Sequence, residues 1–167
     1  GFKGKGSDEW YTPDSVFAWL GVERTKLHDP FPRHGEGGLT AAWPGLTWLN
    51  PPYSIIDAVV RRAAKEPDWV FIAWCRMETK WAQLLMKSCD AMLFPTQRVK
   101  FIDGRETLEV TEIVDGIPVT REVENPGWMK PGKTPGAPSM LAARGDGVRL
   151  LRHASNHGHG TMLYSGL

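Results

Sequence analysis

Cysteine, net charge and long apolar runs are all scarce in this chain of 167 residues. Its two cysteines, Cys75 and Cys89, fit neither a disulfide framework nor the ligand spacing of a zinc site, which favours a reducing interior. The absence of any apolar run of about 18 residues argues against membrane insertion, so we expect a soluble, cytoplasmic protein. The formal net charge is only +1, and overall charge therefore neither supports nor excludes a polyanionic partner.

The composition is sufficient for one globular domain, because 41% of the residues are hydrophobic. We place this domain at residues 8–152, with an inserted hairpin and Pro/Gly-rich loop at 107–135. Residues 1–7 are rich in Gly and Lys and predict a flexible end. Residues 153–167 carry three histidines in a Gly-rich sequence without apolar period, which predicts a flexible tail rather than a metal site.

Strand and helix patterns alternate along the first two thirds of the chain. Apolar runs predict strands at 26–31, 46–49, 69–75 and 91–96, and the continuous run at 69–75 is typical of a central parallel strand. Helical spacing predicts helices that start near Asp14, after Tyr53 and at 77–89. This order predicts an α/β sheet, with antiparallel strands added near the C-terminus.

A β-hairpin is predicted at 107–124, because Asp115-Gly116 lies between two segments of alternating apolar and polar residues. Two interpretations of this hairpin remain open. It enters a DNA groove or fills the gap that a flipped base leaves, or it packs on the edge of the sheet.

The segment TWLNPPYS, residues 47–54, ends a predicted strand on an amide and two prolines. The Asn50 side chain and the Pro51 carbonyl offer two acceptors, and the prolines hold the backbone in one conformation at low entropic cost. Such a pair can accept both hydrogens of an exocyclic amino group, while the Tyr53 ring stacks on a flat base. The alternative is a Pro-rich turn between strand and helix, with Tyr53 in packing.

The tetrapeptide Asn50-Pro51-Pro52-Tyr53 resembles the catalytic signature of amino-group DNA methyltransferases, and its Asn form suggests adenine. Four further segments, DEWYTP (8–13), FIAWCRMETKW (71–81), RVKFIDGR (98–105) and GAPSML (136–141), resemble in order the small phage-type DNA N-6-adenine methyltransferases. The resemblance spans most of residues 8–144.

This resemblance implies a reduced Rossmann-like methyltransferase sheet with a C-terminal hairpin extension. It also implies S-adenosylmethionine as methyl donor, double-stranded DNA with a flipped adenine as substrate, and a bacterial host. Two alternatives stay open: a catalytically silent methyltransferase shell that binds DNA or a host protein, and an enzyme that acts on cytosine N-4 or a modified base.

The resemblance implies a binding site for the methyl donor. Its residues are Trp10, Thr12, Pro13, Asp29, Pro30 and Phe31, with Gly35 and Gly37 after them. Trp10 either shapes the donor pocket or only packs. Only about twenty residues separate Asp29 from Asn50, which is too few for the strand–helix repeats that normally supply the acidic ligand of the donor ribose. Glu36 and Asp57 are the remaining acidic choices for that ligand.

Several basic side chains fall in segments that the predicted sheet brings to neighbouring strand ends, where they can contact DNA phosphates. For any one of them, a solvated surface charge is the alternative. The proposed group consists of Arg76, Lys80, Arg98, Lys100, Arg105, Lys130 and Lys133.

Overall fold

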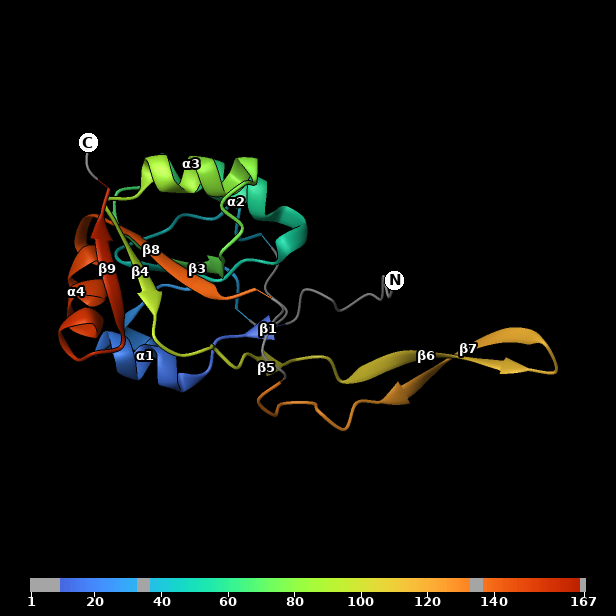
Figure 1. The fold of residues 1–167 in the computed structure, drawn as a ribbon. Coiled ribbons are helices and arrows are strands. Elements are labelled where there is room, and N and C mark those ends of the chain that lie inside the picture. Colours follow the sequence, from blue (N-terminus) through green and yellow to red (C-terminus); the bar gives the residue numbers. More distant parts are fainter. Residues whose placement is uncertain (1–9, 33–36, 133–136, 166–167) are drawn as a thin grey trace.

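A mixed five-stranded sheet lies at the centre of the computed structural model, which describes residues 10–32, 37–132 and 137–165 (Figure 1). The strand order is β2-β3-β8-β4-β9. Strand β2 is parallel to β3, β8 is antiparallel to both β3 and β4, and β9 is antiparallel to β4. Strands β2, β3 and β4 therefore run in one direction. The strands are β2 (Thr47–Leu49), β3 (Trp69–Trp74), β8 (Ser139–Arg144), β4 (Ala91–Pro95) and β9 (Gly160–Tyr164).

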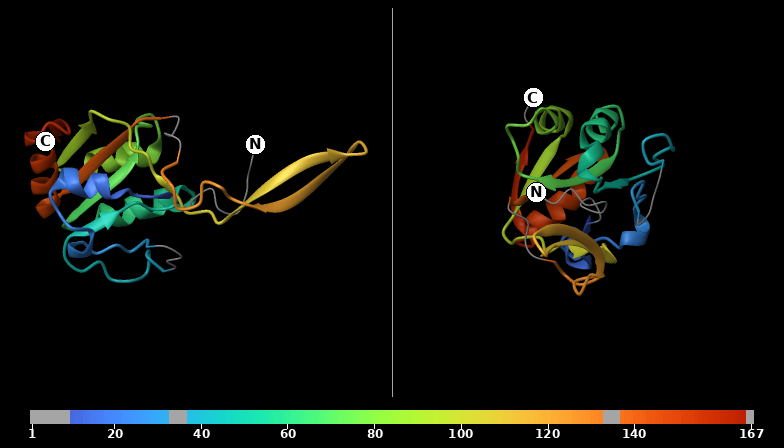
Figure 2. Two further views of the ribbon diagram at one scale, coloured as in Figure 1. Left: turned by 90° about the horizontal axis from the view of Figure 1, so that it is seen from below. Right: turned by 90° about the vertical axis from the view of Figure 1, so that its right-hand side faces the viewer.

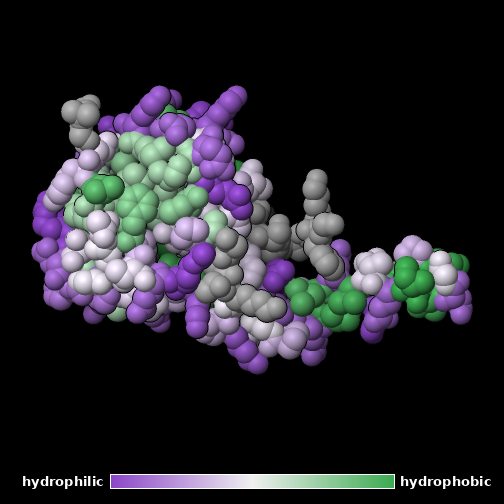
Figure 3. Space-filling model, viewed as in Figure 1, coloured by the Kyte–Doolittle hydropathy of each residue, from purple (hydrophilic) through white to green (hydrophobic). Residues whose placement is uncertain are grey.

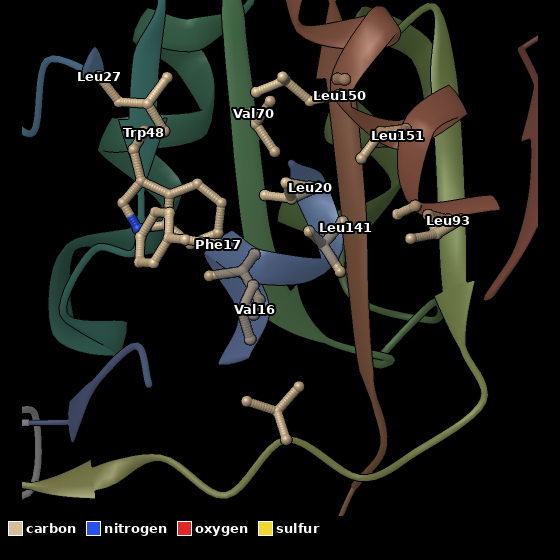
Figure 4. Close-up of a cluster of buried hydrophobic side chains, with 14 of the residues drawn as sticks. Val16, Phe17, Leu20, Leu27, Trp48, Val70, Leu93, Leu141, Leu150 and Leu151 are labelled. Carbon is tan, nitrogen blue, oxygen red and sulfur yellow. The ribbon is translucent and has the colours of Figure 1, made fainter. Parts of the chain in front are cut away.

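Two helices cover each face of this sheet (Figure 1). Side chains alternate between the faces: on β8, Leu141 and Ala143 join one apolar cluster, and Met140 and Ala142 join the other. The first cluster is drawn in Figure 4, where the Phe17 ring lies against Trp48 with centroids 4.8 Å apart. Helices α1 (Asp14–Leu20) and α4 (Val148–Asn156) pack on this first cluster. Helices α2 (Ile56–Ala63) and α3 (Lys80–Ser88) pack on the second.

Two small antiparallel sheets lie outside the central one. Strand β1 (Trp10–Tyr11) pairs with β5 (Ile102–Asp103). Strands β6 (Thr107–Val114) and β7 (Ile117–Glu124) form the predicted hairpin, with φ of 51° at Asp115 and 77° at Gly116, as a two-residue turn of type I′ requires. The hairpin projects from the body (Figures 1 and 2), so the prediction that it packs on the sheet edge is wrong.

The prediction of an α/β protein is confirmed, but two of the predicted strands differ. Residues 26–31 form a single parallel bridge, between His28 and Thr47, after the 3-10 turn η1 (Arg24–Lys26). Strand β3 is central and buried as predicted, yet it is parallel only to β2, because β8 lies antiparallel on its other side. A continuous apolar run reports burial on both faces and carries no information about the direction of a neighbour.

The C-terminal segment, predicted as a flexible tail, is ordered structure up to residue 165. It completes α4 and then forms β9, which pairs with β4 along its whole length. Leu150, Leu151 and Ala154 are buried on one side of α4, and this helical pattern crosses the boundary drawn at residue 153. Pairing of β9 uses backbone groups, which need no apolar period. Within the described ranges, each helix is too short or too polar to cross a bilayer.

Candidate functional site

One edge of the central sheet gathers most of the predicted site residues. Because β2, β3 and β4 run in the same direction, their carboxyl ends share this edge, and Asn50 and Cys75 directly follow β2 and β3. The parallel bridge of His28 with Thr47 brings residues 29–31 out beside β2 at the same edge. Ligands of open α/β sheets bind at the carboxyl ends of strands. Residues 29–31 and Asn50 therefore leave the sheet next to each other at this edge.

The Asn50 side chain is held by the N-terminal segment. Its Nδ2 donates to the Trp10 carbonyl at 3.0 Å and to Thr12 Oγ1 at 3.1 Å. A carbonyl oxygen only accepts, so the amide nitrogen and not the amide oxygen faces Trp10. Thr12 is itself buried, and its carbonyl accepts from Arg24 at 2.6 Å. Among the described residues, nothing donates to Asn50 Oδ1, and this oxygen remains available as an acceptor.

The two prolines form a rigid connection from β2 to α2. Pro52 is extended, with φ −55° and ψ 135°, and its carbonyl accepts from the Ile55 amide at 3.1 Å, which starts the 3-10 turn η2 (Tyr53–Ile55). No donor to the Pro51 carbonyl occurs in the described part of the chain. Two acceptors that are adjacent in sequence, Asn50 Oδ1 and the Pro51 carbonyl, are thus unused by the fold.

Tyr53 is packed against aromatic residues of β3 and α3. Its ring stacks on Trp74 with centroids 4.2 Å apart, and it meets Trp81 edge-on at 6.2 Å. The Tyr53 hydroxyl accepts from the Trp74 amide at 2.6 Å. Burial raises the pKa of the phenol above its ordinary value, although the Trp74 hydrogen bond lowers it. Trp74 therefore covers one face of the ring.

The residues predicted to bind the methyl donor divide into two groups. Thr12 and the backbone of Trp10 contact Asn50, and Pro13 directly precedes α1. Asp29 Oδ1 accepts from the Phe31 amide at 2.9 Å, and no described residue donates to its Oδ2. Burial raises the pKa of Asp29, and this outweighs the lowering by the Phe31 amide.

The other residues predicted to bind the methyl donor are occupied by packing, are exposed or lie outside the described residues. Pro30 is buried. Phe31 packs edge-on against Trp43, with centroids 6.4 Å apart. Asp57 is exposed in the first turn of α2, whereas Gly35 and Glu36 lie outside the described residues.

Arg105 is engaged within the protein rather than presented to a ligand. Its Nε and Nη2 donate to the two oxygens of Asp103 at 2.8 and 2.6 Å, and its guanidinium lies 4.9 Å from the centre of the Trp10 ring. Burial opposes ionisation of Asp103, but hydrogen bonds from Arg105 and Asn125 outweigh it and lower the pKa of the carboxyl. The Arg105 guanidinium is therefore occupied within the fold.

The remaining predicted phosphate-binding residues are exposed where the structure describes them. Arg76 and Lys80 follow β3, and Arg98 and Lys100 follow β4, so these four lie on segments that leave the edge at which Asn50 lies. The Arg76 guanidinium is 5.7 Å from the centre of the Trp74 ring. Lys130 is exposed in the loop after the hairpin, and Lys133 lies outside the described residues.

Sequence reasoning missed the aromatic support of Tyr53, which Trp74 and Trp81 provide. It also missed Ser139, at the start of β8, whose buried Oγ has no hydrogen-bond partner among the described residues. No sequence signal distinguished this serine. In the described part of the chain, His, Cys, Asp and Glu side chains form no group of three that could hold a metal ion.

Comparisons of the chain with models of protein families, with curated proteins and with solved structures found no match. What the protein does is therefore inferred from the chemistry of this edge and from the resemblance of its motifs.

Proposed function

We propose that this protein is a DNA methyltransferase that transfers a methyl group from S-adenosylmethionine to the exocyclic N-6 amino group of adenine in double-stranded DNA. The observation that carries the proposal is the orientation of Asn50. Its amide nitrogen is bound by Trp10 and Thr12, so Oδ1 and the neighbouring Pro51 carbonyl are left as acceptors at the edge of the sheet. An exocyclic amino group has two hydrogens, which two acceptors match.

The proposed chemistry follows from what these acceptors do to an amine. S-adenosylmethionine, when bound, supplies an electrophilic methyl group on a sulfonium. Methyl transfer would form an N–C bond to the adenine nitrogen and break the S–C bond of the donor, and the positively charged nitrogen would then lose a proton to solvent. Asn50 Oδ1 and the Pro51 carbonyl orient the amine and stabilise this developing charge. Tyr53 stacks on the flipped base, and no covalent intermediate with the protein is needed.

The residues near Asn50 fit part of the donor. Asp29 Oδ2 can accept a hydrogen bond from a hydroxyl or an ammonium group of the donor, and it lies on the segment that leaves the sheet beside β2. Thr12 contacts the Asn50 amide, and Pro13 is its neighbour in the chain. These residues place the donor next to the acceptor pair in the proposed complex.

Substitution of Asn50 tests the proposal. We expect Asn50→Ala to abolish transfer of a labelled methyl group to unmodified DNA, with donor binding by calorimetry nearly unchanged. The matched control is Asn156→Ala at the exposed end of α4, which should methylate at the wild-type rate. Wild-type activity in Asn50→Ala would remove Asn50 from the site. Mass analysis of the nucleosides distinguishes methylated adenine from cytosine N-4 methylation.

A second function, a catalytically silent DNA-binding or host-interaction protein, is favoured by one feature of the sheet. Strand β2 pairs with β3 on one side. On its other side, the only backbone pairing among the described residues is the single bridge between His28 and Thr47. In the part of the chain that the structure describes, no strand occurs there to carry further ligands of the methyl donor. Calorimetry separates the two functions, because a silent protein would show no donor binding with or without DNA.

A further inference from the structure

The β6–β7 hairpin has two chemically different faces. Residues that are directly paired across the two strands point to the same side, so the register assigns every side chain to a face. One side, here named the apolar face, carries Leu108, Val110, Val114, Ile117, Val119 and Val123. The other side, the acidic face, carries Glu109 directly opposite Glu122 and, at its base, Glu124.

The apolar face is uncovered in the structure. Within the described chain, β6 and β7 pair only with each other, and the hairpin extends away from the body in Figure 1 and in the left view of Figure 2. Ile117, Val114 and Val119 are 64%, 49% and 45% exposed, and apolar side chains follow the hairpin in Figure 3. An isolated two-stranded hairpin is at best marginally stable in water. A second layer over the apolar face would stabilise it.

The negative charge of the hairpin argues against nucleic acid as the partner that covers the apolar face. Residues 106–124 carry six carboxylates and only one basic residue, Arg121, a formal charge of −5. Phosphates would be repelled, so the interpretation that the hairpin enters a DNA groove loses its electrostatic support. The facing Glu109 and Glu122 side chains also need water, and the acidic face should therefore stay exposed.

We propose that the apolar face packs against the same face of a second copy of this chain, across a two-fold axis. A two-fold interface must be self-complementary, and this face satisfies the condition. Its only charged residues are Glu112 and Arg121, one of each sign, joined at 2.8 Å between Oε1 and Nη2. Antiparallel packing of two such faces lets Arg121 of each copy meet Glu112 of the other.

The dimensions suit such a contact. Each eight-residue strand spans roughly 26 Å, and two stacked sheets lie about 10 Å apart. The apolar side chains of both copies then share one buried layer, while the acidic faces point outwards to solvent. The proposal rests on the hairpin alone and does not depend on methyl transfer.

Two isoleucines near the turn give a matched test. Ile117 on the apolar face and Ile113 on the acidic face are 64% and 70% exposed. In sedimentation equilibrium of the full chain, we expect the wild type and Ile113→Lys to dimerise and Ile117→Lys to be a monomer. Circular dichroism checks that both variants keep the folded body. A monomeric wild type, or equal dissociation of the two variants, overturns the proposal.

A charge exchange tests the partner itself. Glu112→Arg and Arg121→Glu each place like charges across the proposed axis, so each variant alone should dissociate. An equimolar mixture of the two restores opposite charges, and native mass spectrometry should detect the mixed dimer. If the variants dissociated only because each had lost the Glu112–Arg121 ion pair within its own hairpin, mixing them would not restore the dimer. Failure of the mixture to associate would therefore exclude this interface, and a different protein would be the occupant.

Discussion

The orientation of the Asn50 amide can be tested with one isosteric substitution. Asn50→Asp keeps the shape of the side chain and replaces the amide nitrogen by oxygen. In the wild type, this nitrogen donates to the Trp10 carbonyl at 3.0 Å and to Thr12 Oγ1 at 3.1 Å. In the variant, a carboxylate oxygen faces a carbonyl oxygen at that distance. The Thr12 hydroxyl can turn and donate, but the Trp10 carbonyl cannot.

The expected cost follows from these two hydrogen bonds. Loss of the bond to Trp10 costs about 1 kcal/mol, and a carboxylate oxygen placed against the Trp10 carbonyl adds roughly 1–3 kcal/mol. We therefore expect Asn50→Asp to lower the free energy of unfolding by about 2–4 kcal/mol at pH 7. Asn50→Ala should cost less, because it places no charge beside the carbonyl. The Asp variant should thus be the less stable of the two.

The pH dependence has a defined sign. The protonated carboxyl can donate to the Trp10 carbonyl, so the fold raises the pKa of the introduced group. A raised pKa means that the folded state binds the proton more tightly, and the deficit should shrink as the pH falls to about 4. Urea denaturation followed by tryptophan fluorescence measures this at both pH values.

The control is Asn156→Asp at the exposed end of α4, which should change stability by only about 0.3 kcal/mol. If Asn50→Asp is as stable as the wild type at pH 7, the amide nitrogen does not face Trp10. Oδ1 would then accept from the Thr12 hydroxyl, and the proposed acceptor pair would not exist.

Three further predictions concern the surroundings of the site. Tyr53→Phe should lower stability by roughly 1–3 kcal/mol, because the backbone N–H that bonds the hydroxyl at 2.6 Å loses its acceptor. Since burial raises the pKa of Tyr53, an absorbance titration should find a phenol that ionises above the ordinary range of tyrosine, and stability should fall above about pH 10. Arg105→Ala leaves the Asp103 carboxylate without its guanidinium and should cost about 2–3 kcal/mol in urea denaturation. Because the pKa of Asp103 is lowered, the ionised group contributes stability that is lost as the pH falls below about 4, and the difference from the wild type should shrink there. Arg98→Ala combined with Lys100→Ala should weaken DNA binding and reduce the slope of log K against log salt by about 0.9 for each phosphate that the protein no longer neutralises.

The DNA experiment has a matched control in Lys65→Ala combined with Lys87→Ala. Both lysines are exposed and precede strands β3 and β4, so they lie at the opposite edge of the sheet. This control should leave the salt slope unchanged. Equal slopes for the two double variants would remove Arg98 and Lys100 from the proposed phosphate contacts.

Features that depend on neighbouring residues could be predicted from the sequence. Asp115-Gly116 specifies its turn through the positive φ that both positions adopt. The apolar run at 69–74 specifies a buried strand, because such a segment is stable only when both faces are covered. The segment that begins at Asn50 specifies its rigid exit from β2 through the prolines themselves. Each of these features rests on local conformational preference.

Features that join distant segments were decided by the fold. Strand β8 enters between β3 and β4, and this order is set by packing of both sheet faces rather than by any period within β8. The Asn50 amide is oriented by Trp10 and Thr12, 40 and 38 positions away in the chain. The sequence predicted an acceptor at Asn50. Which of its two polar atoms is left for a ligand depends on a hydrogen bond that exists only once the N-terminal segment lies against the end of β2.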